Sequence, residues 1–273
     1  MVAAEAPGWL EDSIATTDEL IAEGEYSAKT LDWGDVKPVF MEIQANKCIF
    51  CEQKMEDKRI HHDLEHFRPK SSIKKWPKRA DSNLFDFKLG EKSDTGYFWL
   101  AYELFNYAAS CKQCNTSQKS NNFPIAGART LAAGTNVSDL NDAEKPFICY
   151  PIGSLDTDPE KIIEFNITVA KPVFNSGIKH RRARVMIELF KLNDRDDLHY
   201  QRAFAIRMLF LSLSMGDDEM VDLLLNGNAQ HTSCLRSFHK LWLEDNARAI
   251  EAHDVCRQLL IDALENETPN LGV

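Results

Sequence analysis

Two Cys-x-x-Cys pairs constrain the fold of this chain more than any other feature of its sequence. The first pair is Cys48 and Cys51 (CIFC), the second is Cys111 and Cys114 (CKQC), and 59 residues separate the pairs. Two residues between cysteines allow both thiolates to face one metal ion, and two such turns complete a tetrahedral zinc site. The spacing therefore predicts a structural Zn²⁺ ion that clips a folded segment. Two metal-free turns or a redox couple are the alternatives that spacing leaves open.

The other three cysteines are isolated in the sequence. They bring the total to 7, an odd number, which argues against a disulfide framework. Free cysteine behaves as a small apolar residue, so we expect buried packing for Cys149, Cys234 and Cys256.

The net charge of −10 would ordinarily argue against binding to nucleic acid. The charge is unevenly divided, however. Residues 1–46 carry 2 basic and 10 acidic side chains, residues 47–124 carry 14 and 10, and residues 125–273 carry 16 and 22. The segment that holds both cysteine pairs is thus a basic island in an acidic chain, and nucleic acid stays open as a partner.

The sequence contains no signal for a membrane or for secretion. Its most apolar run, residues 208–215, is too short to span a bilayer. The N-terminus is acidic from Glu5 onward and has no basic region followed by an apolar stretch, so no signal peptide is expected. We expect a cytoplasmic protein with no membrane partner.

Hydrophobic patterning divides the chain into four stretches. Residues 9–46 are predicted to be mostly helical, and residues 47–124 are rich in loops. Two runs typical of strands follow at 147–152 and 162–170, with turn residues between them. From 179 to about 265 the pattern is helical.

Helix caps and domain boundaries follow from the same patterns. Asp217 or Asp218, and Ser233, are expected to cap C-terminal helices. We predict an acidic helical segment, a module that holds the cysteine pairs, a loop region with a small β element, and an α-helical region, with boundaries at 1–46, 47–125, 126–178 and 179–273.

The residues between and beside the cysteine pairs resemble a known nuclease motif. The segment Leu64–Lys70 reads LEHFRPK, Asn106 precedes the second pair, and Asn115 and Lys119 follow it. This combination resembles the HNH (ββα-metal) nucleases, in the variety that a four-cysteine zinc site clips. The resemblance covers roughly residues 47–124, and it implies an α+β protein with a ββα-metal core inside the clip.

The resemblance implies roles that suit the chemistry of these residues. Hydrolysis of a phosphodiester needs an activated water and a cation near the phosphate. His66 would be the general base, because a neutral imidazole accepts a proton near pH 7. Glu65 and Asn115 would hold Mg²⁺ or Mn²⁺, and Asn106 would brace the loop that aims His66. Phosphate contacts are expected from Arg68, Lys70, Lys74, Lys75 and Lys119.

Each of these assignments has a structural alternative. His66 could be a half-buried structural histidine, Glu65 could merely orient the imidazole, and Asn115 could be only a helix N-cap. Adjacent side chains on a strand point to opposite faces, so Glu65 and His66 serve one site only at a strand end or a bulge. For the same reason His61 and His62 are expected to be solvated.

Two basic clusters are further candidates for phosphate contacts. The tract 67–80 carries six cations around Trp76 and suits tracking of a nucleic-acid backbone, with Trp76 as a stacking platform. A solvated loop with Trp76 packed inward is the alternative. The second cluster, at the start of a predicted helix, could meet a phosphate or simply face solvent; it contains Lys179, Arg181, Arg182 and Arg184.

The C-terminal half extends the resemblance. Residues 145–165 and 175–202 resemble the HNH nuclease subunits of Septu-type and retron-associated antiphage defence systems. This resemblance implies a DNA endonuclease that works with an ABC-type ATPase partner, with a mainly helical C-terminal region. A nuclease that cleaves RNA, including tRNA, and a non-catalytic zinc-organised adaptor for nucleic acid or protein are the alternatives.

Overall fold

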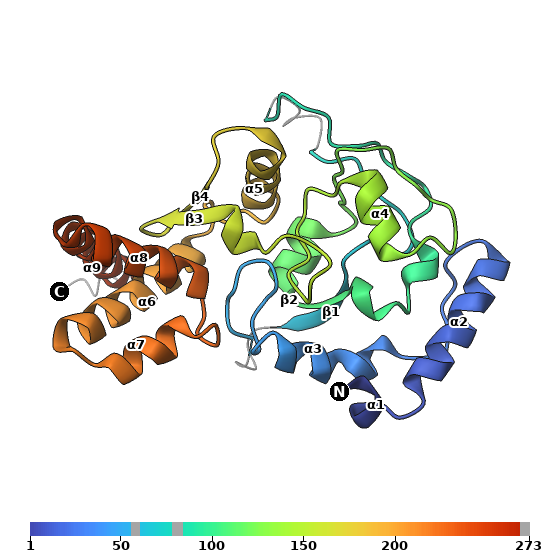
Figure 1. Cartoon of the computed structure of the whole chain (residues 1–273), viewed down its shortest axis with the longest axis horizontal. Coiled ribbons are helices and arrows are strands. Elements are labelled where there is room, and N and C mark those ends of the chain that lie inside the picture. Colours follow the sequence, from blue (N-terminus) through green and yellow to red (C-terminus); the bar gives the residue numbers. More distant parts are fainter. Residues whose placement is uncertain (56–60, 78–83, 268–273) are drawn as a thin grey trace, which may run out of the picture. The chain divides into compact units, whose positions relative to one another are not determined.

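The computed structural model describes residues 1–55, 61–77 and 84–267. The chain forms two compact units, one of residues 1–50 and 55–158 and the other of residues 51–54 and 159–273 (Figure 1). The described residues form helices and two small antiparallel sheets, which agrees with the predicted α+β class. The predicted boundaries at 46 and 125 fall inside the first unit, and the predicted segment 126–178 contains the division at 158.

The first unit is built around two paired strands. Its helices and strands are α1 (Val2–Glu5), α2 (Trp9–Glu23), η1 (Trp33–Val36), α3 (Lys37–Ile43), β1 (His62–His66), η3 (Phe98–Leu100), η4 (Leu104–Asn106), β2 (Tyr107–Cys111), η5 (Gln113–Lys119) and α4 (Val137–Glu144). Strands β1 and β2 are antiparallel, with His62 opposite Cys111 and His66 opposite Tyr107. A π-helical turn, η5, follows β2 almost at once.

Strand β2 lies at the centre of this unit, because each of its five residues is buried. The first cysteine turn lies along it through a hydrogen bond from the backbone N–H of Ile49 to the oxygen of Ala109. The side chain of Gln44, just after α3, bonds both the N–H and the C=O of Ala109. The β2 backbone is therefore paired on both sides, as a buried strand requires.

The N-terminal segment is helical over α2 and α3, as predicted for 9–46. Trp9 opens α2, is buried, and donates from its indole N–H to the backbone oxygen of Asp32 (2.9 Å). Its ring also meets that of Tyr107 edge to face, at 6.2 Å between centroids. The acidic segment is thus part of the first unit's core.

The prediction of a strand at 147–152 is wrong. Residues Phe147–Tyr150 are buried, but their backbone groups are satisfied outside a sheet: Phe147 N–H donates to Pro124, and Tyr150 N–H donates to the carboxylate of Asp156. Prolines at 146 and 151 bracket the run, and proline cannot donate to a strand ladder.

The run 162–170 forms two strands rather than one. These are β3 (Ile163–Asn166) and β4 (Val169–Pro172), which pair as an antiparallel hairpin in the second unit. The chain reverses at Ile167, whose φ is +56°. Such a conformation is rare for a β-branched residue, and the sequence therefore gives no turn signal there.

The second unit is otherwise helical, as predicted from 179 onward. It contains η6 (Pro159–Lys161), α5 (Gly177–Leu189), α6 (Asp196–Met215), α7 (Asp218–Leu225), α8 (Thr232–Glu244) and α9 (Asn246–Glu267). Helices α6, α8 and α9 share one buried core, which includes Ile206, Leu235 and Cys256. No helix among the described residues is long and apolar enough to cross a membrane.

One of the two predicted caps is confirmed in this unit. Asp217 accepts a hydrogen bond from the N–H of Met220 at the start of α7. Ser233 does not cap α8, which begins at Thr232 with His231 as its N-cap residue. The carboxylate of Glu52 accepts from the N–H of Ser233 instead (3.2 Å), so a distant residue supplies the capping acceptor.

Candidate active site and four-cysteine cluster

The four paired cysteines come together, as their spacing predicts. All four are buried, and the Sγ atoms of Cys48, Cys51, Cys111 and Cys114 lie within 4.8 Å of one another. A tetrahedral zinc ion with Zn–S distances of about 2.3 Å places its sulfurs about 3.8 Å apart, so this donor set fits zinc. The N–H of Cys114 also donates to the Sγ of Cys111 (3.5 Å), which favours the thiolate that zinc binds. The three isolated cysteines are buried, as expected.

One face of β1 carries two carboxylates that meet side chains of η5. Asp63 and Glu65 are two residues apart on the strand and therefore share this face. The amide nitrogen of Asn115 donates to Asp63 Oδ2 (3.2 Å), and the ammonium of Lys119 donates to Glu65 Oε1. The carboxylate of Asp63 can accept only from the NH₂ group of Asn115, which leaves the amide oxygen of Asn115 for another partner.

Glu65 and Lys119 form a buried ion pair. Lys119 also donates to the backbone oxygen of His66 (3.0 Å), so its ammonium lies at the end of β1. Burial raises the pKa of Glu65, and the cation of Lys119 opposes that shift. Lys119 bonds Oε1 of Glu65, and Oε2 has no hydrogen bond among the described residues.

His66 is the last residue of β1 and points away from Glu65. Its Nε2 lies 3.0 Å from the backbone oxygen of Ala101. A carbonyl oxygen only accepts, so Nε2 carries the hydrogen and Nδ1 presents a lone pair. Burial, together with the cations of Lys70 and Lys119, lowers the pKa of His66 to about 3, so the imidazole is neutral at pH 7.

Aromatic rings fix the orientation of the His66 imidazole. The rings of Trp33 and Tyr107 each meet it edge to face, at 5.0 and 5.2 Å between centroids. The hydroxyl of Tyr107 donates to the same Ala101 oxygen that His66 uses. His62 lies on this face of β1 as well, half-buried rather than solvated as expected.

Asn106 connects the ends of the loop between the two strands. Its Oδ1 accepts from the N–H of Arg68 (2.7 Å), and its Nδ2 donates to the oxygens of Arg68 (3.1 Å) and Leu100 (3.0 Å). The N–H of Phe67 donates to the backbone oxygen of Asn106 (2.7 Å). These bonds fix the backbone directly after His66.

The five predicted phosphate contacts divide by exposure. Lys74 and Lys75 are exposed and Lys70 is half-buried, so all three can meet a ligand at the surface. Arg68 and Lys119 are both 0% exposed, and neither can contact a phosphate in this structure. The assignment of these two as phosphate contacts is therefore replaced by the buried ion pairs that they form.

Trp76 and the second basic cluster differ in their exposure to solvent. Trp76 is half-buried against Phe85, at 5.6 Å between ring centroids, which favours inward packing. Residues 78–80 of the basic tract lie outside the described residues. In α5, Lys179 and Arg181 are exposed at a helix start that has no side-chain cap.

Arg68 is the centre of a buried polar network. Its guanidinium pairs with Glu144 at the end of α4, donates to Asn141 (2.8 Å) and lies over the rings of Tyr97 and Phe123. Glu144 also accepts from the hydroxyl of Tyr97 (2.9 Å). The network joins α4 to the loop that follows His66.

Replacement of Arg68 by alanine is expected to destabilise the protein by about 3–5 kcal/mol, because it leaves the Glu144 carboxylate buried without its counter-ion. Urea unfolding checks this value. Lys75→Ala is the matched control: its ion pair with Glu91 is exposed and should contribute less than about 1 kcal/mol. Equal unfolding free energies for the two variants would contradict the role of the network.

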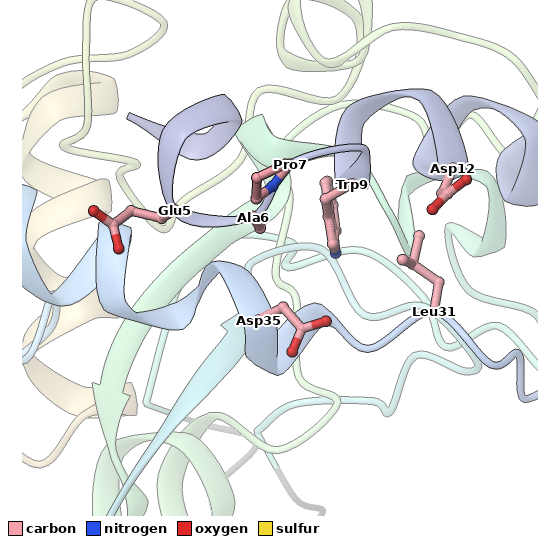
Figure 2. Close-up of a pocket in the computed structure, with 7 residues that line it drawn as sticks. All are labelled: Glu5, Ala6, Pro7, Trp9, Asp12, Leu31 and Asp35. Atoms are coloured by element: carbon pink, nitrogen blue, oxygen red, sulfur yellow. The ribbon is translucent and has the colours of Figure 1, made fainter.

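A small acidic pocket lies in the N-terminal segment, away from these residues. Figure 2 shows Pro7 and Trp9 between the carboxylates of Glu5, Asp12 and Asp35. Its volume is about 240 Å³, below the about 300–1,000 Å³ of typical small-molecule sites. The pocket contains none of the residues that the sequence motif predicts.

Sequence reasoning missed three residues of the candidate site. Asp63 could have been found from the sequence, because it lies two residues before Glu65 and alternate side chains of a strand share one face. No sequence signal pointed to Trp33 and Glu144, since they lie outside the motif and contact its residues only in the folded chain.

The chain is similar to one curated relative over half of its length. It is 29% identical over 133 residues to the Septu protein PtuB of Bacillus mycoides (strain KBAB4), and the two are distant homologues in that region. The aligned residues are 49% of this chain and only 39% of that protein, so the match spans about two fifths of the relative. No protein-family model matches the chain, and no solved structure matches it.

Proposed function

We propose that this protein is a metal-dependent HNH endonuclease that hydrolyses phosphodiester bonds. One observation carries the proposal: Asp63 and Glu65 share one face of β1 and meet Asn115 and Lys119 of η5, and His66 lies at the end of the same strand. The four-cysteine cluster holds the start of η5, since Cys111 and Cys114 flank it. A ββα-metal core inside a zinc clip accounts for this arrangement.

The residues present fit a hard divalent cation. Mg²⁺ and Mn²⁺ prefer carboxylate and amide oxygens, and they commonly bind through one or two carboxylates together with water. Glu65 and Asn115 would hold the ion, with Asp63 orienting the amide of Asn115. When bound, the cation would neutralise charge on the phosphate and on the leaving oxygen.

His66 performs the proton transfer in this proposal. Its Nε2–H is held by Ala101, so the lone pair of Nδ1 accepts the proton of the attacking water. Trp33 and Tyr107 keep the ring in place and Asn106 holds the backbone that follows it. In-line attack at phosphorus would give 5′-phosphate and 3′-hydroxyl ends.

DNA is the proposed substrate, and antiphage defence with an ABC-type ATPase partner is the proposed setting. The similarity to the Septu protein PtuB supports the setting, together with the sequence resemblance to HNH subunits of defence systems. The exposed Lys74 and Lys75 support contact with a nucleic-acid backbone. The proposed site residues do not distinguish deoxyribose from ribose, so cleavage assays must compare DNA with RNA.

The test is cleavage of plasmid DNA and of RNA with Mg²⁺ or Mn²⁺, compared with the same reactions in EDTA. We expect cation-dependent cleavage of DNA. Cleavage of RNA but not of DNA would identify the protein as an RNA-cleaving nuclease. No cleavage and no binding of Mn²⁺ would identify a non-catalytic zinc-organised adaptor and refute the proposal.

Replacement of Asn115 by alanine is expected to raise the Mn²⁺ concentration needed for half-maximal cleavage by about 10-fold or more, because the cation loses an oxygen ligand. Titration of the cleavage rate with Mn²⁺ checks this, and excess Mn²⁺ should restore much of the rate. Asn121→Ala is the matched control, since this amide bonds Ser72 just beyond η5. An equal shift in both variants would exclude Asn115 as a ligand.

A further inference from the structure

Trp33 lies outside the zinc-clipped segment, yet it contacts two candidate active-site residues. Its ring meets the imidazole of His66 at 5.0 Å between centroids and at 84° between planes. The ammonium of Lys70 lies 3.7 Å from the centroid of the same indole. One side chain of the acidic N-terminal segment thus touches both the proposed base and a cation next to it.

Lys70 is held by aromatic faces rather than by a carboxylate. Tyr26 provides a second ring, 4.8 Å from the ammonium, and Lys70 forms no ion pair within the described part of the chain. Burial lowers the pKa of Lys70 to about 8, and the charge of Glu65 opposes that shift. A cation–π contact leaves the N–H donors of an ammonium for other acceptors. Lys70 is therefore a positioned cation whose donors can meet an anion beside Glu65 and His66.

The position of Trp33 is fixed by the backbone around it. Trp33 opens the short helix η1, and Asp32 caps that helix by accepting from the N–H of Gly34 (2.7 Å). The backbone oxygen of Asp32 accepts from the indole of the buried Trp9 (2.9 Å). The indole of Trp33 is only half-buried, whereas Trp9, Phe40 and Tyr107 form the buried aromatic packing of this region. A role in core filling alone does not explain its placement.

We propose that Trp33 is a positioning residue of the active site, which holds the ammonium of Lys70 beside His66 so that Lys70 meets the phosphate under attack. The inference rests on the proposed nuclease function and deepens it. It makes the N-terminal segment a working part of the site, because Trp33 and Tyr26 both belong to residues 1–46.

The first test is single-turnover cleavage by the full chain with Trp33→Leu, Trp33→Phe, Lys70→Ala and the double variant Trp33→Leu/Lys70→Ala. We expect Trp33→Leu to lower the rate by about 10-fold to 100-fold, because Lys70 loses its position. Trp33→Phe should recover part of the rate, since a phenyl face still attracts a cation. The two losses should be less than additive in the double variant, because Trp33 acts in part through Lys70 and in part through its contact with His66.

Two further measurements separate positioning from folding or affinity. Affinity for the same nucleic acid without divalent cation should change by less than about 3-fold, since the exposed Lys74 and Lys75 contribute to binding independently of Trp33. In protein carrying ¹³C-lysine, the ε-methylene signal of Lys70 should lie upfield in the wild type, under the indole ring current. It should return to the ordinary lysine position in Trp33→Leu and stay partly shifted in Trp33→Phe.

A wild-type rate in Trp33→Leu, or fully additive losses in the double variant, would overturn the inference while leaving the nuclease function intact. An unshifted Lys70 signal in the wild type would overturn it as well. A wild-type chain that cleaves neither DNA nor RNA with any divalent cation would refute the nuclease function, and this inference with it.

Discussion

Replacement of His66 by alanine is expected to lower the rate of cation-dependent cleavage by about 10²-fold to 10⁴-fold, because the attacking water loses its general base. The loss should appear in the chemical step and not in zinc content, since His66 is not a member of the four-cysteine cluster. Single-turnover cleavage at equal zinc content measures it.

His62 provides the matched control for this substitution. It lies on the same face of β1, four residues earlier, and is half-buried. His62→Ala removes an imidazole from the strand without touching the proposed base, so its rate should stay within about 3-fold of wild type. Undiminished cleavage by His66→Ala, or an equal loss in both variants, would remove His66 from the mechanism.

Loss of the proposed zinc ion is expected to have the largest effect on stability. A structural zinc ion contributes on the order of 10 kcal/mol in small zinc domains. Without it, four buried thiols lose their common partner and the start of η5 loses its anchor beside β2. We expect Cys114→Ala to lower the melting temperature by more than about 10 °C and to abolish zinc binding.

Cys149 is the matched control for Cys114, since both side chains are 0% exposed and only Cys114 belongs to the cluster. Cys149→Ala should retain about one zinc per chain and lose about 1 kcal/mol of stability. Metal analysis and thermal unfolding of both variants check the prediction. A wild-type protein with well under one zinc per chain would refute the clip.

The sequence could predict those parts of the site that depend on local spacing. The cysteine pairs met as expected because a two-residue gap restricts a short turn, whatever the rest of the chain does. Helices after residue 179 were also predictable, because apolar periodicity is a local property. The sequence required a strand end or a bulge if Glu65 and His66 were to serve one site, and the two residues lie at a strand end.

The features that sequence reasoning missed depend on partners far away in the chain. Arg68 looked like a phosphate contact because its counter-ion, Glu144, lies 76 residues later. Lys119 was predicted to be a phosphate contact for the same reason, since its partner Glu65 is 54 residues earlier. The prediction of a strand at 147–152 was wrong because the run is apolar for burial and not for strand pairing. Its backbone bonds groups in loops, such as the carboxylate of Asp156. Hydrophobic patterns in a sequence predict burial well, but they do not predict which distant residue is the counter-ion of a buried charge.

The second unit is built from two separate segments of the chain, residues 51–54 and the residues from 159 onward. Glu52 accepts from the backbone N–H groups of His231 and Ser233 at the start of α8, and Gln53 accepts from the side chain of Arg195. A fragment that begins at Pro159 therefore lacks acceptors that its own helices use. No single cut in the polypeptide yields both units complete, so fusion or truncation at one point cannot exchange the helical unit.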